Sequence, residues 1–509
     1  MVSIVGLLLL VISFGLLSVH AIQVLNVTKL GSDPQTVNRL NGESFQQDAL
    51  VTFNGFQYAV LWVPTANSSV RNAAIRRRSL PHGDWEGFVF TDYNQTDDDG
   101  HDIISLGISP GDGTLHLIWD QHDNSLNYRS SIAGVATNPT AVNFTGQLFS
   151  PLSDFLPGLE SLDKNVYFIN VTYPRFLRIP SSNTSSADLL LEMRVGQAGQ
   201  GDDWLYHYTP RSNWTLVGRY LEGVNNNAYI NGLDFSSEGV LETTWTYRDY
   251  VNTTGQDVAV EAGPNGPENA CASSWFIYLE NHDMDYAYSA DLGFTWHNNW
   301  GQVIGNLKAG TPIVPVSAGI TMFGIPKYGG ILNQEAQTLD RENRMHVLNR
   351  ENTTGIEQWS VQSVRATIVP NVPVSRYHYW RSSEIDWTRI ALPLSLAAHS
   401  INNITRTPTV IGKRGKLVSP PGFDTLLAVL PSNAPNSTGL SILGSTSRRH
   451  FEDWKILWEI SSGCGWEPLF DRYRLNMEDG GDGVLSLYLV NGTEVVVMDL
   501  DLQLKPVDV

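Results

Sequence analysis

The sequence predicts an all-β fold, and more narrowly a seven-bladed β-propeller. Three observations favour this fold: an alternation of apolar and polar residues with a period of two, an internal repeat of turns and strands, and one hairpin motif typical of propeller blades. A repeat of this kind predicts a ring of small, similar sheets.

The alternation is the broadest of these signals. Runs rich in Val, Ile, Tyr, Trp and Thr recur between turns of Gly, Asn, Asp and Pro, which is the pattern of short strands. Beyond the N-terminus, no stretch of the sequence shows convincing helical periodicity. We therefore expect a chain that is almost wholly β.

The repeat consists of a turn rich in Asp, Gly or Ser, an apolar strand, and a further strand that ends in an aromatic residue. Its clearest copies are Ser109–Trp119 with Leu126–Tyr128, Ser236–Trp245 with Met284–Tyr288, and Asp340–Val347 with Ile356–Trp359. Weaker copies lie near Phe53–Trp62, Ala187–Tyr208, Thr425–Trp458 and Val484–Met498. Together these units predict seven blades, with a pair of β-sandwiches or a β-helix as the alternative architecture.

Ser289–Trp296 fits the Asp-box hairpin turn, which lies between the outer strands of propeller blades. It reads Ser-Ala-Asp-Leu-Gly-Phe-Thr-Trp. Ser289 and Asp291 should cap a tight turn by hydrogen bonds, Gly293 should supply an unusual backbone angle, and Trp296 should pack beneath. The motif favours the propeller and carries no information about chemistry.

Residues 1–21 are expected to form a signal peptide. Ile4–Leu17 is apolar and short for a membrane span, and small residues follow it, although the usual basic residues before it are missing. A buried first strand or helix is the alternative. Glycosylation sequons from Asn26 to Asn491 also indicate a secretory route. We expect a secreted glycoprotein, not attached to a membrane, whose residues 22–509 form one propeller domain and act as a monomer.

Charge and cysteine content narrow the choice of partners. The net charge of −19 argues against nucleic acid and anionic membranes, while a local pocket of Arg and His could still bind an acidic sugar. Cys271 and Cys464 could pair in an oxidising compartment, but the sequence does not show that they meet.

No cofactor is expected to be required. The acidic turn Asp97–Asp99 leaves a structural calcium ion open, although such turns are usually only solvated.

Titratable side chains stand beside predicted strand ends in three segments. The first is Asp99–Gly107 with Trp119–Arg129, which contains His101 and His122. The second is Val171–Phe176 with Leu191–Gly196, which contains Tyr173 and Arg194. The third is Thr244–Asp249 with Asn281–Asp283, which contains Arg248 and His282. A histidine on a strand is by itself more often a core or turn residue than a catalyst. Four histidines that lack such neighbours are therefore interpreted as structural or surface residues: His82, His116, His346 and His378.

The order and spacing of these segments resemble the BNR-repeat propeller polysaccharide lyases, and most closely the fungal L-rhamnose-α-1,4-D-glucuronate lyases, which are related to ulvan lyases. The likeness runs from about Phe53 to past Trp387. Its elements are Gly100–Gly107, Asp120–Arg129, Thr172–Phe176, Met193–Gly196, Trp245–Arg248, Asn281–Asp283, the Asp box, Leu332–Gln337 and Tyr377–Arg381. A polar stretch, Ser181–Ser186, lengthens one hairpin relative to the family.

The resemblance implies a pocket on one face of the propeller, near its axis. The catalytic residues that it implies are His122, His101, Tyr173, Arg194 and Arg248. The substrate-binding residues are Asn281, His282, Asn333, Gln334, Glu335 and Tyr377, and no metal ligands are implied.

These residue types suit β-elimination from a uronate. An arginine can pair with the sugar carboxylate and stabilise the anion that forms when C5 loses its proton. A base must reach C5–H and a proton donor must reach the departing O4, on the same side of a glucuronate, so one residue or two neighbours can serve both ends. His122 is the leading candidate for this work, with His101 beside it and Tyr173 as an alternative acid or base.

By resemblance, then, the expected activity is a secreted lyase that releases rhamnose from side chains of arabinogalactan or gum arabic, with the acidic plant polysaccharide as partner. An ulvan lyase or another uronate lyase is the nearest alternative. A sialidase-like glycosidase would share the propeller and the Asp box, and Arg178-Ile179-Pro180 echoes a sialidase motif. A non-catalytic propeller lectin would not need the cluster of His, Tyr and Arg.

Overall fold

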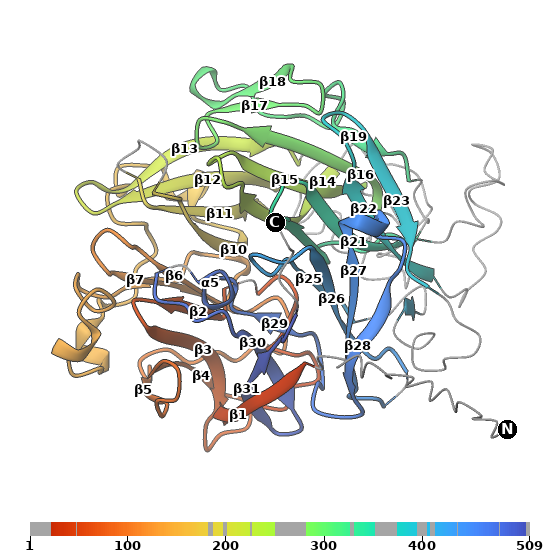
Figure 1. The fold of residues 1–509 in the computed structure, drawn as a ribbon. Helices are drawn as coiled ribbons and strands as arrows, with labels where there is room; N and C mark the ends of the chain where they lie inside the picture. The colour runs from red at the N-terminus through yellow and green to blue at the C-terminus, as the bar shows by residue number, and fades with distance from the viewer. Residues whose placement is uncertain are drawn as a thin grey trace, which may run out of the picture.

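The computed structural model describes residues 22–504, except for 47, 182–186, 197–200, 224–225, 250–280, 326–329, 352–373, 394–404, 408–412, 435 and 478. The described residues form seven antiparallel sheets, which follow one another in chain order around a common axis (Figure 1). The predicted all-β fold and its seven blades are confirmed. The predicted signal peptide, 1–21, lies outside the described residues.

The first three blades each begin with the strand that lies nearest the axis. Their strands are β2 (Leu50–Phe53), β3 (Phe56–Pro64), β4 (Arg71–Ser79) and β5 (Glu86–Val89); β6 (Ile104–Ile108), β7 (Leu115–Trp119) and β9 (Tyr128–Ser130); and β10 (Val171–Arg178), β11 (Leu189–Val195), β12 (Asp202–Thr209) and β13 (Asn213–Leu221), with β8 (His122–Asn124) paired to β10.

The other four blades complete the ring. Their strands are β14 (Asn226–Phe235), β15 (Leu241–Asp249), β16 (Asn281–Ser289), β17 (Thr295–His297) and β18 (Val303–Asn306), with β19 (Thr321–Phe323) on β16; β20 (Ala336–Leu339), β21 (Met345–Glu351), β22 (Val374–Arg381) and β23 (Trp387–Ala391), with β24 (Arg406–Thr407) on β22; β25 (Lys416–Val418), β26 (Thr425–Pro431), β27 (Leu440–Thr446) and β28 (Lys455–Ile460); and β29 (Leu469–Phe470), β30 (Leu485–Asn491), β31 (Glu494–Asp501) and β1 (Gln23–Ser32).

Each of the seven repeat units seen in the sequence falls in a different one of these sheets. The part of the fifth unit at Ile356–Trp359 lies outside the described residues. Short helical pieces interrupt the strands: α1 (Lys164–Tyr167), α5 (Arg472–Leu475) and 3₁₀ turns at Pro139–Ala141, Gly146–Leu148, Leu307–Ala309 and Ser447–Arg449. No helix in the described part of the chain combines the length and the apolar character needed to cross a bilayer.

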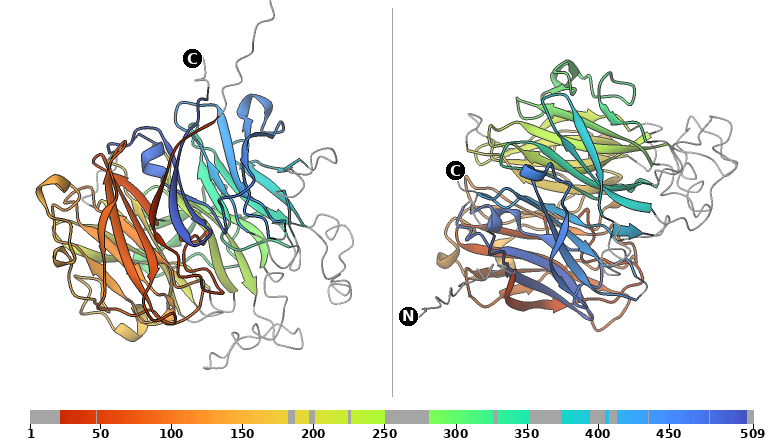
Figure 2. Two further views of the ribbon diagram at one scale, coloured as in Figure 1. Left: turned by 90° about the horizontal axis from the view of Figure 1, so that it is seen from below. Right: turned by 45° about the vertical axis from the view of Figure 1, so that its right-hand side comes forward.

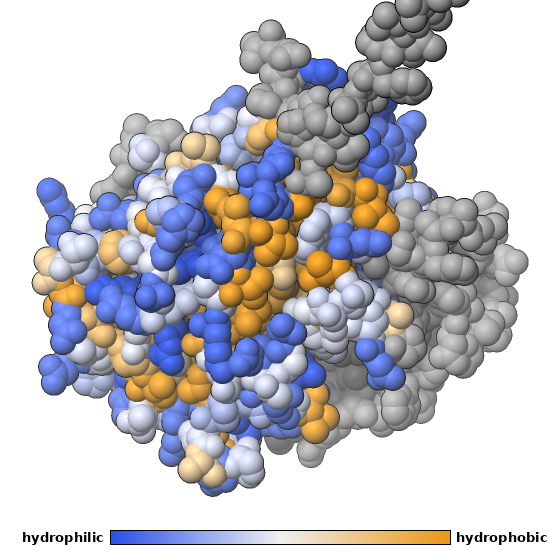
Figure 3. Space-filling model, turned by 60° about the horizontal axis from the view of Figure 1, so that its bottom comes forward, coloured by the Kyte–Doolittle hydropathy of each residue, from blue (hydrophilic) through white to orange (hydrophobic). Residues whose placement is uncertain are grey.

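The ring is closed by the two ends of the chain. β1 pairs antiparallel with β31, from Gln23 opposite Asp501 to Ser32 opposite Glu494, and the left view of Figure 2 shows the first and last strands side by side. β1 is the outermost strand of its sheet and exposes Val24, Leu25 and Val27. Figure 3 shows a largely polar surface crossed by an apolar band. The last blade therefore combines a strand from the N-terminal part of the chain with strands from the C-terminal part, which closes the ring.

The core lies between neighbouring sheets, and both faces of each inner strand are covered. β6 and β10 are buried along their whole length, and adjacent blades contact one another through β2, β6, β10, β14, β20 and β25. Strands covered on both faces carry nearly continuous apolar runs, which is why the clear alternation belongs mainly to the outer strands. Trp62, Trp119, Trp214, Trp245 and Trp296 are fully buried between the sheets.

The Asp box forms the predicted turn between β16 and β17. Ser289 Oγ accepts from the Gly293 N–H at 2.8 Å, and Asp291 Oδ1 accepts from the Thr295 N–H at 2.7 Å. Gly293 has a φ of 90°, and the buried Trp296 ring donates its Nε1–H to the Gly293 carbonyl at 2.9 Å. The sequence prediction for this hairpin is confirmed in each of these details.

Two other predictions, the longer hairpin and the pairing of the two cysteines, involve residues outside the described part of the chain. The polar stretch Ser181–Ser186 lies in the hairpin between β10 and β11, where Arg178 pairs with Leu189, and 182–186 are outside the described residues. Cys464 is buried, and its thiol donates to the Trp466 carbonyl at 3.2 Å. Cys271 lies outside the described residues, so the pairing of the two cysteines stays a prediction.

One segment without repeat character crosses the axis. This axial segment, Leu40–Gln46, precedes β2 and is buried throughout. The Ser44 hydroxyl donates to the Glu335 carbonyl at 2.8 Å in the fifth blade, and Lys416 Nζ donates to the Ser44 carbonyl at 2.6 Å from the sixth. The segment thus fills the axis at the face where β20 and β25 begin.

Candidate active site

A stacked pair of histidines lies on the face where the inner strands begin. His101 stands in the loop before β6 and His122 is the first residue of β8; their ring centroids are 3.9 Å apart and the rings are nearly parallel, at 14°. The carboxylate of Asp99 lies between them: Oδ1 is 2.5 Å from His101 Nδ1 and Oδ2 is 2.6 Å from His122 Nδ1. One carboxylate therefore orients both rings.

These contacts fix the chemistry of the two rings. An ionised carboxylate can only accept hydrogen bonds, so each Nδ1 carries the shared hydrogen, and the lone pair of either ring in its neutral form is on Nε2. Burial, together with the neighbouring His122, lowers the pKa of His101 to about 4. Burial also acts to raise the pKa of Asp99, but the hydrogen bonds from both histidines hold it well below its usual range. His101 is therefore neutral, and Asp99 charged, near neutral pH.

A strand that crosses between blades brings His122 to its place. β8 lies between β7 and β9 of the second blade in the chain but pairs with β10 of the third, which sets His122 opposite Thr172. Asp120 and Asp123, on either side, have φ values of 59° and 56°, in a region that non-glycine residues seldom adopt. The Asp123 N–H donates to Thr172 Oγ1 at 3.0 Å and holds the crossing strand against β10.

Tyr173 occupies a bulge in β10. Its φ is 56°, and the pairing with β11 shifts register between Thr172 and Arg175. The ring is buried, with centroids 5.2 Å from Phe45 and 5.7 Å from His101. Burial raises the pKa of Tyr173, although the nearby arginines act in the other direction. The phenol therefore keeps its proton near neutral pH and is suited to donate it.

The two predicted arginines surround Tyr173 in different ways. Arg194 is buried behind it, with its guanidinium 5.2 Å from the Tyr173 ring centroid and Nη2 2.9 Å from Asp123 Oδ1. Arg248 is half-buried and lies 4.5 Å from the centroid of Tyr229, whose ring packs against Tyr173. Arg248 is thus the more accessible of the two to a sugar carboxylate, and Arg194 acts on Tyr173 through its charge.

Phe45 and Arg414 complete the cluster, and no motif in the sequence predicts either of them. Phe45, from the axial segment, stacks on His101 at 5.5 Å and 14°. The guanidinium of Arg414 lies 5.4 Å from the centroid of Phe45 and is paired with Glu467 at 3.1 Å. Arg414, Phe45, His101 and His122 follow one another in contact, so the axial segment supplies the wall behind the histidines.

Three of the six predicted substrate-binding residues lie in the turn before β20. Asn333, Gln334 and Glu335 are buried, and the Asn333 carbonyl accepts from Arg414 Nε at 3.1 Å. The Glu335 carboxylate accepts from Arg376 Nε at 2.9 Å and from the Gly415 N–H at 3.2 Å. Glu335 therefore fastens neighbouring blades together on the face that carries the histidines.

The other three lie on β16 and β22. Asn281 is buried and donates to the Ile331 carbonyl at 3.3 Å, while His282 Nδ1 lies 2.9 Å from Asp283 Oδ2. Tyr377 is covered by Arg389, 5.6 Å from its ring centroid. Within the described residues, no hydrogen bond or ring contact joins any of the six to the histidine pair. Their binding roles stay predictions.

Among the described residues, Asp99, His101 and His122 are also the one group of side chains whose ligand atoms are close enough together to hold a metal ion. Two imidazole nitrogens and a carboxylate suit zinc, whereas calcium prefers ligands that are all oxygen. The calcium ion that the acidic turn leaves open therefore gains no support from this cluster. In the turn itself, Asp98 accepts from the N–H groups of Val37 and Asn38.

The sequence matches the model of the BNR repeat-containing family over residues 56–393, more than half of the chain. The chain belongs to this family. The match begins at β3 and ends just after β23, so it includes every predicted catalytic residue of this BNR repeat-containing protein.

Two curated relatives are each described as the long isoform of an ulvan lyase. The one from Alteromonas sp. (strain LOR) is 26% identical over 160 residues, which cover 27% of this chain and 15% of the relative. The one from Pseudoalteromonas sp. (strain PLSV) is 27% identical over 156 residues, covering 26% and 15%. The aligned part thus spans less than a fifth of the length of either relative.

The fold of this BNR repeat-containing protein is similar to that of the polysaccharide lyase Uly1. The TM-score is 0.62 at 15% sequence identity, and the likeness covers 92% of this chain and 91% of the other. A similarity that spans nearly the whole of both chains agrees with the seven-bladed propeller described above.

Proposed function

We propose that this protein is a secreted polysaccharide lyase that cleaves the L-rhamnose-α-1,4-D-glucuronate linkage by β-elimination. It would release rhamnose from side chains of arabinogalactan or gum arabic. The observation that carries the proposal is the histidine pair bridged by Asp99 and set beside the protonated Tyr173. The similarity to ulvan lyases supports the class of reaction, and the resemblance of the motifs to rhamnose–glucuronate lyases supports the linkage.

The elimination uses a base and an acid on one side of the sugar. The lone pair on His122 Nε2 takes the proton from C5, and the electron pair left behind forms the C4=C5 double bond. The C4–O4 bond breaks, and the departing oxygen, which belongs to rhamnose, takes the proton of the Tyr173 hydroxyl. Asp99 stabilises the imidazolium formed on His122. Transfer of the imidazolium proton from His122 to the Tyr173 phenolate then restores the neutral histidine and the protonated tyrosine.

The arginines and His101 support this step. The half-buried Arg248 pairs with the glucuronate carboxylate and stabilises the negative charge that spreads onto it as C5 loses its proton. Arg194, buried behind Tyr173, positions the ring and favours its transient phenolate. His101, held neutral against Phe45, lets His122 become positive without a second charge stacked on it.

Several further properties belong to the same proposal. The protein would act outside the cell as a monomer on an acidic plant polysaccharide and would need no cofactor. Ulvan is the second candidate substrate, since both curated relatives are described as ulvan lyases. Its uronate would be cleaved by the same chemistry, so only a direct comparison of substrates separates the two.

The test is to follow ultraviolet absorbance while the purified protein digests gum arabic or ulvan, with the released sugars analysed in parallel. A rise in absorbance together with free rhamnose from gum arabic is expected, because the new double bond is conjugated with the carboxylate. His122→Ala should abolish both signals, and His82→Ala, at an exposed position, should not. Sugar release without absorbance would mean hydrolysis and contradict the lyase. Activity on ulvan alone would move the assignment to that substrate.

A further inference from the structure

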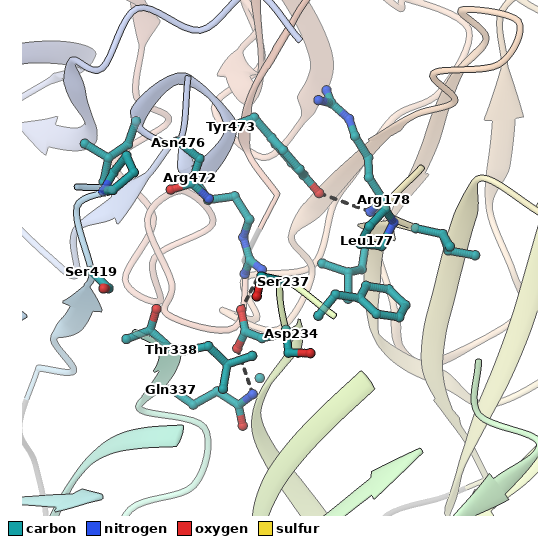
Figure 4. Close-up of a pocket in the computed structure, with 18 of the residues that line it drawn as sticks. Leu177, Arg178, Asp234, Ser237, Gln337, Thr338, Ser419, Arg472, Tyr473 and Asn476 are labelled. Carbon is teal, nitrogen blue, oxygen red and sulfur yellow. Dashed lines mark hydrogen bonds and ion pairs between the residues drawn. The ribbon is translucent and has the colours of Figure 1, made fainter. Parts of the chain in front are cut away.

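A cavity of about 1080 Å³ opens at the end of the axis opposite the histidine pair. It is lined where β10, β14, β20 and β25 end and by α5 (Figure 4). His101 and Tyr173, by contrast, lie where the inner strands begin. Lys416 lies between the two sites, because it lines the cavity and bonds to Ser44 of the axial segment. None of the predicted catalytic or substrate-binding residues is among the described residues that line the cavity.

Two ion pairs lie in the wall of the cavity, one between Arg472 and Asp234 and one between Arg178 and Asp479. Arg472 Nη1 lies 3.0 Å from Asp234 Oδ1, and Asp234 Oδ2 accepts from Gln337 at 2.7 Å, as Figure 4 shows. The side chains of Arg472 and Asp234 are 24% and 15% exposed. In the described part of the chain, Arg472 donates through Nη1 alone, which leaves Nε and Nη2 as donors for a ligand.

The charges that line the cavity balance. Four carboxylates stand against four basic groups: Asp188, Asp234, Asp340 and Asp479, with Arg178, Arg341, Lys416 and Arg472. Arg178 is paired with Asp479 at 3.1 Å, as Arg472 is with Asp234. An anionic ligand would meet carboxylates without an excess of cations, so the wall disfavours a uronate or a phosphate.

The remaining side chains suit a sugar. Ser237, Thr338, Ser419 and Asn476 add hydroxyl and amide groups, labelled in Figure 4. A sugar hydroxyl can accept from an arginine and donate to an aspartate at once, which matches the Arg–Asp pairs. Partly exposed Phe235 and Phe470 add apolar surface for the C–H faces of a sugar ring.

We propose that this cavity is a second carbohydrate-binding site, which holds a neutral oligosaccharide. Its volume is at the upper end of the ~300–1,000 Å³ of small-molecule sites, enough for more than one sugar unit. The proposal does not rest on the lyase activity, because the two sites lie on opposite faces. The second site would bind uncharged parts of a polysaccharide, which the catalytic face would not recognise.

The test uses gum arabic whose uronates have been reduced to neutral sugars, so that it offers the catalytic face no carboxylate. Binding is measured by the retardation of the full-length protein in gels that contain this polymer. The wild type should be retarded, and Asn476→Ala and Arg472→Lys should each weaken binding about tenfold, the effect of losing one good polar contact. Asn138→Ala is the matched control, because Asn138 is also exposed and does not line the cavity.

Three outcomes would overturn the proposal. The first is a wild type that is not retarded, and the second is unchanged retardation in both cavity variants. The third is loss of retardation in His122→Ala, which would place binding on the catalytic face. If circular dichroism shows that Arg472→Lys does not fold, the retardation of Asn476→Ala, a change at an exposed residue, is the test. An absence of elimination on untreated gum arabic would count against the lyase and leave this site standing.

Discussion

Asp99 is the residue on which the candidate site depends most. It holds the two histidines by separate carboxylate oxygens, and Oδ1 also accepts from the backbone N–H of His101. A charged partner at Nδ1 raises the basicity of Nε2 and stabilises the imidazolium that forms when the ring takes a proton. The same carboxylate keeps both rings parallel, so orientation and charge come from one side chain.

Replacing Asp99 tests this role directly. In Asp99→Asn, one amide oxygen can accept from only one histidine and the amide nitrogen must face the other, so one ring loses its orientation. We expect kcat for rhamnose release to fall by about 10²–10⁴, the usual contribution of a positioned acid or base, with a smaller change in KM. Asp97→Asn is the matched control, because Asp97 is exposed and its carboxylate makes no hydrogen bond within the described residues. Wild-type kcat in Asp99→Asn would refute the role.

At the residue scale, sequence reasoning found the histidines but not what organises them. His101, His122, Tyr173 and Arg194 lie together, and Arg248 joins them through Tyr229, in agreement with the pocket that the family resemblance implies. From the sequence alone, Asp99 belongs to an acidic turn of a kind that is usually only solvated, although its position two residues before His101 is a usable signal. The burial of Arg194 behind Tyr173 could not be predicted, because it depends on the bulge in β10.

At the scale of elements, the axial segment links the blades to the site. Phe45 lies between the guanidinium of Arg414 and the ring of His101, and it excludes water from one side of the histidine. Burial is the main reason that the pKa of His101 falls to about 4. The segment is itself held from the last blade, where Glu467 accepts from the Ser44 N–H at 2.6 Å.

Truncating Phe45 should therefore move the pH profile. In Phe45→Ala, water reaches His101 and its pKa rises from about 4 toward the ordinary value of about 6.5. A protonated His101 stacked on His122 disfavours proton uptake by that base, so the acidic limb of kcat/KM should shift to higher pH. Phe45→Tyr keeps the stacked ring and should keep the wild-type limb. A uniform loss of activity with an unshifted limb would show that Phe45 serves packing alone.

The elements differ in how far they could be predicted. The blades repeat a local pattern of turn and strand, so their number and order could be read from the chain, and the Asp box fixed one hairpin in detail. The axial segment and β8 carry no repeat. Their positions depend on partners that are distant in sequence or in another blade, such as Glu467 for Ser44 and Thr172 for His122. Contacts of this kind leave no periodic trace in a single sequence.

At the scale of the whole molecule, the propeller buries titratable groups between its blades. His116 on β7 is fully buried among Tyr128, Tyr208 and Trp214, with Nδ1 2.7 Å from the Tyr128 hydroxyl. Burial lowers the pKa of His116 to about 3. The interpretation of this histidine as a structural residue agrees with that environment. Its neutral form is a condition of close packing between the second and third blades.

The consequence is a stability that depends on pH. Between about pH 6.5, its pKa in the unfolded chain, and about pH 3, His116 is protonated in the unfolded chain and neutral in the folded one. Its contribution to the free energy of unfolding is therefore complete above about pH 6.5 and is lost as pH falls toward 3. The loss is about 1.4 kcal/mol per pH unit, or roughly 2 kcal/mol at pH 5. Buried carboxylates with raised pKa values, such as Asp102 and Glu242, act in the opposite direction, so wild-type stability alone cannot isolate the effect.

A comparison with His116→Gln removes that complication, because the carboxylates are common to both proteins. The variant should be less stable than the wild type at pH 7, and the difference in the free energy of unfolding should shrink by about 2 kcal/mol at pH 5. Urea unfolding at the two pH values measures it. His82 is exposed, so the difference in the free energy of unfolding between His82→Gln and the wild type should be the same at both pH values. A His116→Gln difference that stays constant with pH would mean that this histidine already carries its proton inside the folded propeller, with the Tyr128 hydroxyl as its acceptor.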